Sequence, residues 1–262
     1  MMSVYDPIAK QYQESRHPNT AFALYIEEPT YFNMLGDITG KSILDLGCGE
    51  GIYARNFKKK GAGRVVAVDI SEGMLTLAKE QEAKEPLGIE YILSDMQELG
   101  QVGSFDVVTA AYSLNHAQTK EQLLAMCRTI YDNLKPECRF VAINNNLDRA
   151  PESLIYINNN LDRPPESYRF LEEYGYEESI SGSKEEGKPL PSLIYQLEDK
   201  TVVIEDYYLS KATYEWAFLE AGFKEIRWHE QTLLEAGIRE FGEEFWQDYV
   251  KYPNMVGIEC WK

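Results

Sequence analysis

The segment whose residue types and spacing are best suited to bind a ligand runs from Leu44 to Gly51 and reads Leu-Asp-Leu-Gly-Cys-Gly-Glu-Gly. The run 41–46 predicts a short strand, and the glycines after it predict a tight turn into a helix. Glycine lets the backbone bend sharply and lets a ligand approach without a Cβ in the way. A second apolar run, 65–68, ends at Asp69, whose carboxylate can accept hydrogen bonds from both hydroxyls of a ribose. The pattern predicts a nucleoside-containing ligand at the ends of two strands.

The same layout serves dinucleotides, so the details of the glycine loop decide between ligands. The dinucleotide fingerprint G-x-G-x-x-G requires a glycine at the position of Ile52. Asp45, two residues before Gly47, would repel a pyrophosphate and attract an ammonium or a sulfonium. This segment therefore resembles motif one of the class I S-adenosylmethionine-dependent methyltransferases, and a nicotinamide-dependent enzyme is disfavoured.

The order of elements predicts an α/β fold. Apolar runs that alternate with helical patterns indicate a parallel sheet covered on both faces. The expected strands are 41–46, 64–69, 89–93, 105–110, 139–143, 225–229 and 256–261, and the expected helices include 52–60, 120–133 and 213–221. The resemblance implies a Rossmann-like, mostly parallel, seven-stranded sheet in which the last strand is the antiparallel insert.

Two segments are expected outside the core sheet. The first 40 residues read as helical and aromatic, and the resemblance implies that Tyr5 or Tyr12 closes over the donor; simple packing of both tyrosines is the alternative. The runs 193–197 and 202–208 read as a β-hairpin. The expected organisation is a helical cap at 1–40, a donor-binding core at 41–145, an insertion loop and hairpin lid at 146–209, and completion of the sheet at 210–262.

The resemblance also implies donor contacts after the third and fourth strands. Asp95 would accept from the adenine amino group, and Met96 would pack on the purine, although Asp95 could instead cap the following turn. Ala111 or its neighbour Ala110 would offer a carbonyl to the methionine ammonium. The full set of expected donor-binding residues is Tyr12, Asp45, Gly47, Cys48, Gly49, Asp69, Ile70, Asp95, Met96 and Ala111.

Candidate catalytic residues follow the strand 105–110, because the carboxyl ends of parallel strands form the ligand crevice of such folds. They are Tyr112, Asn115 and His116. His116 could act as a general base or orient the acceptor, and it could equally fix the loop as a structural histidine. The (Asn/Asp)-Pro-Pro-(Tyr/Phe) motif of DNA and RNA amino methyltransferases is absent from this stretch of sequence.

A narrower resemblance concerns the acceptor. Segments 114–117, 165–167 and 207–223 are similar to toxoflavin synthase and related small-molecule methyltransferases, and the chain is rich in aromatics from residue 168 onward. This implies methyl transfer to a nitrogen of a small heterocyclic molecule by in-line displacement. An O-methyltransferase of a small phenol or acid, or a donor-binding protein without transfer activity, are the alternatives. The chain departs from the family at 134–138, where a Gly-Gly turn is usual.

The composition of the chain limits the kinds of partner that it can bind. The net charge of −17 over 262 residues argues against a nucleic-acid partner, and no apolar run approaches the ~20 residues of a membrane span. With no leader pattern, we expect a cytoplasmic enzyme, monomeric or homodimeric, that acts on a small-molecule acceptor. The four cysteines lack C-x-x-C spacing and the three histidines lack metal-ligand spacing, so we expect reduced thiols and no metal.

An internal repeat follows the fifth expected strand. Residues 143–153 return at 157–167 with a single difference, Ala150 against Pro164. The offset of 14 residues is too short for a solenoid unit, so we interpret the repeat as a tandem duplication within a loop. One copy is expected to finish the strand and the other to form additional loop.

Overall fold

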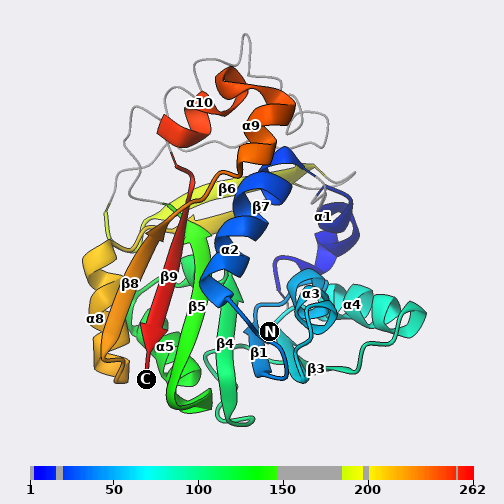
Figure 1. Ribbon diagram of the computed structural model, residues 1–262. Helices are drawn as coiled ribbons and strands as arrows, with labels where there is room; N and C mark the ends of the chain where they lie inside the picture. Colours follow the sequence, from blue (N-terminus) through cyan, green and yellow to red (C-terminus); the bar gives the residue numbers. More distant parts are fainter. Residues whose placement is uncertain (1–2, 16–19, 147–184, 197–200, 252) are drawn as a thin grey trace.

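The computed structural model describes residues 3–15, 20–146, 185–196, 201–251 and 253–262 (Figure 1). Its main sheet has seven strands in the order β3-β2-β1-β4-β5-β9-β8. β9 pairs antiparallel with both β5 and β8, and the remaining pairs are parallel. The strand order reverses between β1 and β4, which is where folds of this kind place their ligand crevice.

The strands of the main sheet are β1 Ser42–Leu46, β2 Arg64–Asp69, β3 Ile89–Leu93, β4 Phe105–Ala111, β5 Leu134–Asn145, β8 Glu225–Glu230 and β9 Met255–Trp261. The α-helices are α1 Ala9–Ser15, α2 Glu28–Leu35, α3 Ile52–Lys59, α4 Glu72–Lys84, α5 Lys120–Asn133, α8 Lys211–Ala221, α9 Glu235–Phe241 and α10 Glu243–Lys251. Short 3-10 or π segments are η1 Asp6–Ile8, η2 Ala23–Glu27 and η3 Leu114–His116, and a separate pair of strands is β6 Pro189–Gln196 and β7 Thr201–Tyr207.

Local sequence signals account for several of the helix ends. The side chains of Ser71, Thr119 and Ser210 accept from backbone N–H groups in the first turns of α4, α5 and α8, which satisfies donors that a helix start leaves unpaired. α8 ends at Gly222 with φ +112°, a conformation that glycine adopts without a Cβ penalty. These caps set where the loops that face the crevice begin.

Two apolar clusters cover the two faces of the sheet. One lies against α5 and α8 and includes Leu44, Leu46, Val108, Phe140, Cys127, Ile130 and Phe218. The other lies against α2 and α3 and includes Tyr31, Leu35, Ile43, Phe57, Val65, Val107 and Trp246. Residues of β1 alternate between the clusters, as a strand buried on both faces requires. The expected seven-stranded α/β sheet is therefore confirmed.

The hairpin β6–β7 runs across the upper end of the sheet in Figure 1, where the parallel strands have their carboxyl ends. The expected hairpin is thus observed between residues 189 and 207. Ile8 of η1 and Ile204 of β7 are both buried and pack together in a small third cluster. The N-terminal segment and the hairpin therefore meet above the strand ends.

The sequence did not predict the two helices between β8 and β9. α9 and α10 hold Trp246, which is fully buried and packs against Tyr25 and Gly237. α9 has seven residues and α10 has nine, and helices this short are not stable in water without tertiary contacts. α8 also begins two residues earlier than expected, because Ser210 rather than a later residue caps it. None of the helices in the described part of the chain is long and apolar enough to cross a membrane.

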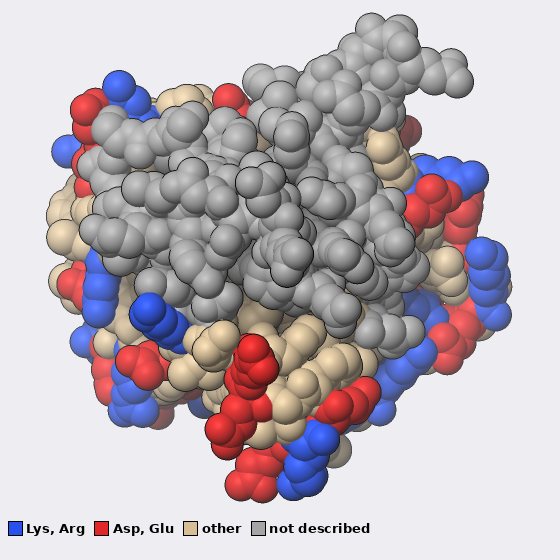
Figure 2. All heavy atoms as spheres, turned by 90° about the horizontal axis from the view of Figure 1, so that it is seen from above, with Lys and Arg blue, Asp and Glu red and all other residues tan. Residues whose placement is uncertain are grey.

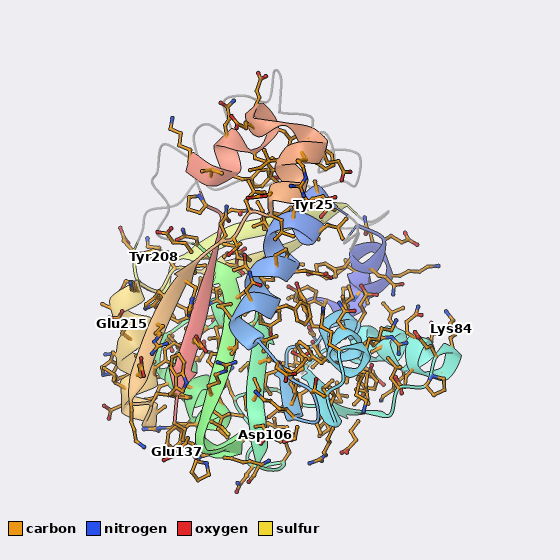
Figure 3. All side chains as sticks on the ribbon, in the orientation of Figure 1. Tyr25, Lys84, Asp106, Glu137, Tyr208 and Glu215 are labelled. Carbon is orange, nitrogen blue, oxygen red and sulfur yellow. The ribbon has the colours of Figure 1, made fainter. Side chains whose placement is uncertain are left out.

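β5 is longer than expected and begins at Leu134, within the segment where the family usually has a Gly-Gly turn. The ladder to β4 shifts register between Phe105 and Val107, and Glu137 has φ +61°. This is the left-handed region, which costs a residue with a Cβ about 1–2 kcal/mol. Glu137 is exposed and lies at the end of the sheet opposite to Tyr208 (Figure 3).

We therefore expect Glu137→Gly to stabilise the fold by about 0.5–1 kcal/mol, because the relief of strain exceeds the entropy cost of glycine. Thermal unfolding would show a midpoint about 2 °C higher. Glu137→Ala is the matched control: it removes the same side chain and keeps the strain, so its midpoint should stay near wild type. A lower midpoint for Glu137→Gly than for Glu137→Ala would show that the left-handed residue carries no strain.

Candidate active site

The glycine loop follows β1 and leads into α3. Gly47, Gly49 and Gly51 have φ of +69°, +56° and +81°, so all three occupy the region that favours glycine. The N–H groups of Gly47 and Cys48 donate to the Val68 carbonyl oxygen at 2.8 and 2.9 Å, which holds the loop against the end of β2. The expected tight turn is confirmed. It places the main chain of the glycine loop at the carboxyl ends of β1 and β2, without side chains from its glycines in the way.

Asp69 connects the glycine loop to the start of α4. One carboxylate oxygen accepts from the Gly49 N–H at 2.7 Å and the other accepts from the Ser71 N–H at 2.8 Å. Burial raises the pKa of Asp69 above its ordinary value, although these hydrogen bonds and the nearby His116 oppose the rise. Each oxygen has two lone pairs, so the carboxylate can still accept from two ribose hydroxyls.

Asp45 is buried beneath the glycine loop. Its Oδ1 accepts a hydrogen bond from the Thr109 hydroxyl at 2.9 Å, across the β1–β4 ladder. The side chain of Asp45 therefore links β1 to β4 one residue before β1 ends. Burial, and after it the charges of Asp69 and Asp45, raise the pKa of the Cys48 thiol, so that thiol is neutral.

The ends of β2 and β3 expose apolar side chains. Ile70 is 38% exposed and Leu93 is 51% exposed, and Leu93 pairs with Asp69 in the ladder. One carboxylate oxygen of Asp95 accepts from the Gln97 N–H at 2.8 Å, so Asp95 does cap the turn that follows it. The other carboxylate oxygen can also accept a hydrogen bond. Met96 is buried in the core, which leaves mainly its backbone for a ligand. The sequence analysis missed Leu93, since an exposed leucine at a strand end has no local signature.

The turn after β4 packs tightly against the glycine loop. The Ser113 hydroxyl donates to the Leu46 carbonyl at 3.1 Å, and a Cβ built on Gly47 would lie only 2.0 Å from that hydroxyl oxygen. Tyr112 has φ +57°, a strained conformation for a residue with a side chain. The Ala111 carbonyl also accepts a hydrogen bond from the Ser113 hydroxyl, at 3.2 Å.

His116 lies between the N-terminal segment and the hairpin. Its Nε2 is 3.2 Å from the Tyr5 hydroxyl, and its Nδ1 is 3.1 Å from the Glu205 carbonyl oxygen. A carbonyl only accepts, so Nδ1 carries the proton and Nε2 accepts from Tyr5. Asp206 of β7 is buried, with Oδ1 3.7 Å from Nδ1. His116 is therefore held in one tautomer with its basic nitrogen toward the N-terminal segment.

The N-terminal segment is anchored over the start of α4. The Asp6 carboxylate accepts from the Ser71 hydroxyl at 2.6 Å and from the Gly73 N–H at 3.1 Å. Burial alone would raise the pKa of Asp6, but these hydrogen bonds outweigh it and lower the pKa. Tyr5 packs edge-on against Tyr12 at 5.2 Å between ring centroids, and Gln13 of α1 donates to Glu50 of the glycine loop.

A cavity of about 350 Å³ opens at the ends of β5 and β8, beside the N-terminus of α8. Its lining includes Asn144, Asn145, Asn146, Lys211, Tyr214, Trp228, His229 and Glu230. Tyr214 and Trp228 pack edge to face, and the Lys211 ammonium lies 5.0 Å from the Trp228 ring centroid. Figure 2 looks down on this end of the molecule, and acidic and basic side chains of the described residues are interspersed over the surface that it shows around the grey region.

The structure brings most of the expected site residues to one end of the sheet. Gly49 donates directly to Asp69, Gly47 donates to the carbonyl of the preceding Val68, and the His116 ring lies near Asp69. Two expected catalytic residues are placed differently. The Tyr112 hydroxyl donates to Glu27 at 2.7 Å on the α2 face of the sheet, and Asn115 is buried with its amide 3.5 Å from the Asn145 carbonyl. Both side chains are placed to support the loop after β4, and their catalytic roles stay predictions.

Comparison with known proteins covers the core of the chain. Residues 43–137 match the profile of a family described as methyltransferase domain. A demethylmenaquinone methyltransferase of Lactococcus lactis subsp. lactis is 37% identical over 123 residues, which are 45% of this chain and 47% of the relative. A ubiquinone biosynthesis O-methyltransferase of Acinetobacter baylyi is 32% identical over 126 residues, 46% of this chain and 50% of the relative. The chain thus spans about half the length of the curated relatives it matches.

The whole fold has counterparts among solved structures. An S-adenosylmethionine dependent methyltransferase from Mesorhizobium loti aligns with a TM-score of 0.61 at 20% identity, covering 93% of this chain and 99% of that one. At this identity the similarity shows the fold. The expected narrower likeness to toxoflavin synthase stays a prediction. Residues 43–137 therefore match a methyltransferase domain, within a chain that shares its Rossmann-like fold with a solved S-adenosylmethionine dependent methyltransferase.

Proposed function

We propose that this protein transfers a methyl group from S-adenosylmethionine to a hydroxyl or a ring nitrogen of a small, planar molecule. The observation that carries the proposal is the join between the glycine loop and Asp69, where three glycines with positive φ meet a buried carboxylate. The glycine loop offers main-chain groups to a ligand, and the Asp69 carboxylate can accept hydrogen bonds from ribose hydroxyls. Both lie at the carboxyl ends of the strands, beside the point where the strand order reverses.

The residues present fit a bound S-adenosylmethionine. Asp69 would hold the ribose hydroxyls, and the exposed Ile70 and Leu93 would flank the adenine, whose amino group Asp95 would bind. The negative Asp45 beneath the loop and the Ala111 carbonyl suit the positively charged methionine end. An adenine ring needs apolar side chains against its faces and a hydrogen-bond acceptor for its amino group. Ile70 and Leu93 would supply the first, and the Asp95 carboxylate would supply the second.

The cofactor supplies an activated methyl group: the acceptor atom bonds to the methyl carbon, the carbon–sulfur electron pair stays on sulfur, and the acceptor releases one proton. The protein must therefore position the acceptor, exclude water and receive that proton. His116 is the candidate proton acceptor. Its Nε2 is the unprotonated nitrogen, and in the structure it accepts a hydrogen bond from the Tyr5 hydroxyl.

A hydroxyl is the first candidate acceptor. The Tyr5 phenol already donates to His116 Nε2, so the geometry for a phenol at this nitrogen exists in the fold. The A. baylyi relative is named an O-methyltransferase, which supports the same choice. The acceptor hydroxyl would take the position that Tyr5 holds.

A ring nitrogen, the expectation from sequence, is the second candidate. Asn144, Asn145 and Asn146 line one side of the cavity, and carboxamides can both donate to and accept from the edge of a heterocycle. Tyr214 and Trp228 would supply aromatic surface for the ring. This support rests on the cavity and on the narrower sequence resemblance.

The test is turnover with a panel of acceptors. We expect S-adenosylhomocysteine and a monomethylated product, detected by mass spectrometry, when the protein meets S-adenosylmethionine and a catechol, a dihydroxybenzoate, a hydroxyquinone or a pteridine. The product structure separates oxygen from nitrogen transfer. Donor binding without methylation of any acceptor in the panel would favour the non-catalytic alternative, and absence of donor binding would refute the proposal.

Replacing His116 separates a general base from a structural residue. With the acceptor found in the panel, His116→Ala should reduce kcat on the order of 100-fold, while the dissociation constant of S-adenosylhomocysteine stays near wild type. Steady-state kinetics and calorimetry measure the two quantities. A loss of kcat within about threefold would assign His116 to loop structure alone.

A further inference from the structure

Asp206 is a buried carboxylate that the donor site does not use. It lies in β7 of the hairpin and is only 3% exposed. Its Oδ2 accepts from the Asn145 amide at 2.6 Å, at the end of β5, and its Oδ1 lies 3.7 Å from His116 Nδ1. A buried carboxylate needs partners, and besides Asn145 the titratable groups near Asp206 are the candidate catalytic histidine and the buried Tyr214, whose pKa is raised by burial first and by the Asp206 charge second.

The groups that face His116 come from three elements. Tyr5 of the N-terminal segment contacts Nε2, and β7 provides the Glu205 carbonyl and Asp206 on the Nδ1 side. Asp69 at the end of β2 lies close enough for its charge to interact with the ring. Of the two carboxylates, Asp206 is on the Nδ1 side, where the proton of the neutral ring resides.

We propose that Asp206 is a positioning residue for methyl transfer, which holds His116 with its proton on Nδ1 and stabilises the imidazolium that forms when Nε2 takes the proton of the acceptor. The proposal rests on the proposed function, with His116 as the base. The proton passes from the acceptor to Nε2 and later to solvent, so His116 returns to its neutral form and Asp206 stays ionised throughout.

The geometry favours an electrostatic role over a role in packing alone. The Glu205 carbonyl already accepts the Nδ1 proton, so Asp206 adds charge rather than the primary hydrogen bond. The contact to Asn145 joins the hairpin to the sheet, and it requires only an acceptor oxygen. An amide at position 206 would keep that oxygen and remove the charge. Asp206→Asn therefore separates the two roles.

Nuclear magnetic resonance tests the coupling without turnover. The chain has three histidines, so His116→Gln assigns the His116 ring among them. In the wild type, long-range proton–nitrogen correlations should show the proton on Nδ1. In Asp206→Asn part of the proton population should move to Nε2, because the negative charge that favours a proton on Nδ1 is lost.

Glu205→Gln is the matched control. It removes a carboxylate one residue away, whose side chain instead accepts from the Tyr207 hydroxyl. The His116 ring should keep its proton on Nδ1 in this variant, as in the wild type. Equal changes of tautomer in both variants, or no change in Asp206→Asn, would overturn the proposal. If Asp206→Asn does not fold, Asp206→Ser provides the same neutral test.

Kinetics with the acceptor found in the panel complete the test. Asp206→Asn should lower kcat about tenfold, with the KM for the acceptor and the affinity for S-adenosylhomocysteine unchanged. A kcat within about twofold of wild type, or an equal loss of donor affinity, would contradict the proposal. A changed tautomer without turnover on any acceptor would instead show that the coupling is real and the proposed function wrong.

Discussion

The hydrogen bonds of the Asp69 carboxylate tie together the parts of the molecule that form the site. Through Gly49 and Ser71 this one side chain holds the glycine loop after β1 against the first turn of α4. The loop can meet it only because its glycines adopt positive φ. Ser71 in turn caps α4 and donates to Asp6, so the N-terminal segment is anchored through the same corner. Burial of a carboxylate is costly, and these backbone donors offset that cost.

The acceptor side is organised around His116 in a comparable way. It connects three segments that are far apart in the chain: the N-terminal segment through Tyr5, the turn after β4 on which it lies, and the hairpin through Glu205 and Asp206. Ile8 and Ile204 pack together beside these contacts. The N-terminal segment contacts His116 through Tyr5 and the start of α4 through Asp6, so it lies over both the proposed acceptor side and the proposed donor side.

The core could be predicted because its signals are local. The strand–glycine–helix pattern at 41–60, the second strand ending in Asp69 and the cap at Ser71 each follow from residue types at adjacent positions. The site beyond the core depends on contacts between distant segments. No local pattern indicates that Tyr5 reaches His116, that Asp206 faces it from β7, or that Leu93 stays exposed. The helices α9 and α10 were missed for the same reason, since the buried Trp246 and its contacts with Tyr25 and Gly237 stabilise them more than helix propensity does.

Calorimetric titration with S-adenosylhomocysteine tests the central claim, that the join between the glycine loop and Asp69 is the donor site. The wild-type protein should bind one equivalent and should bind NAD⁺ far more weakly. Asp69→Ala should weaken the affinity about 30-fold, which corresponds to about 2 kcal/mol for two lost charge-assisted hydrogen bonds. Thermal unfolding measured beside it confirms that the variant is folded. An unchanged affinity in a folded Asp69→Ala variant, or a wild-type protein that prefers NAD⁺, would contradict the account.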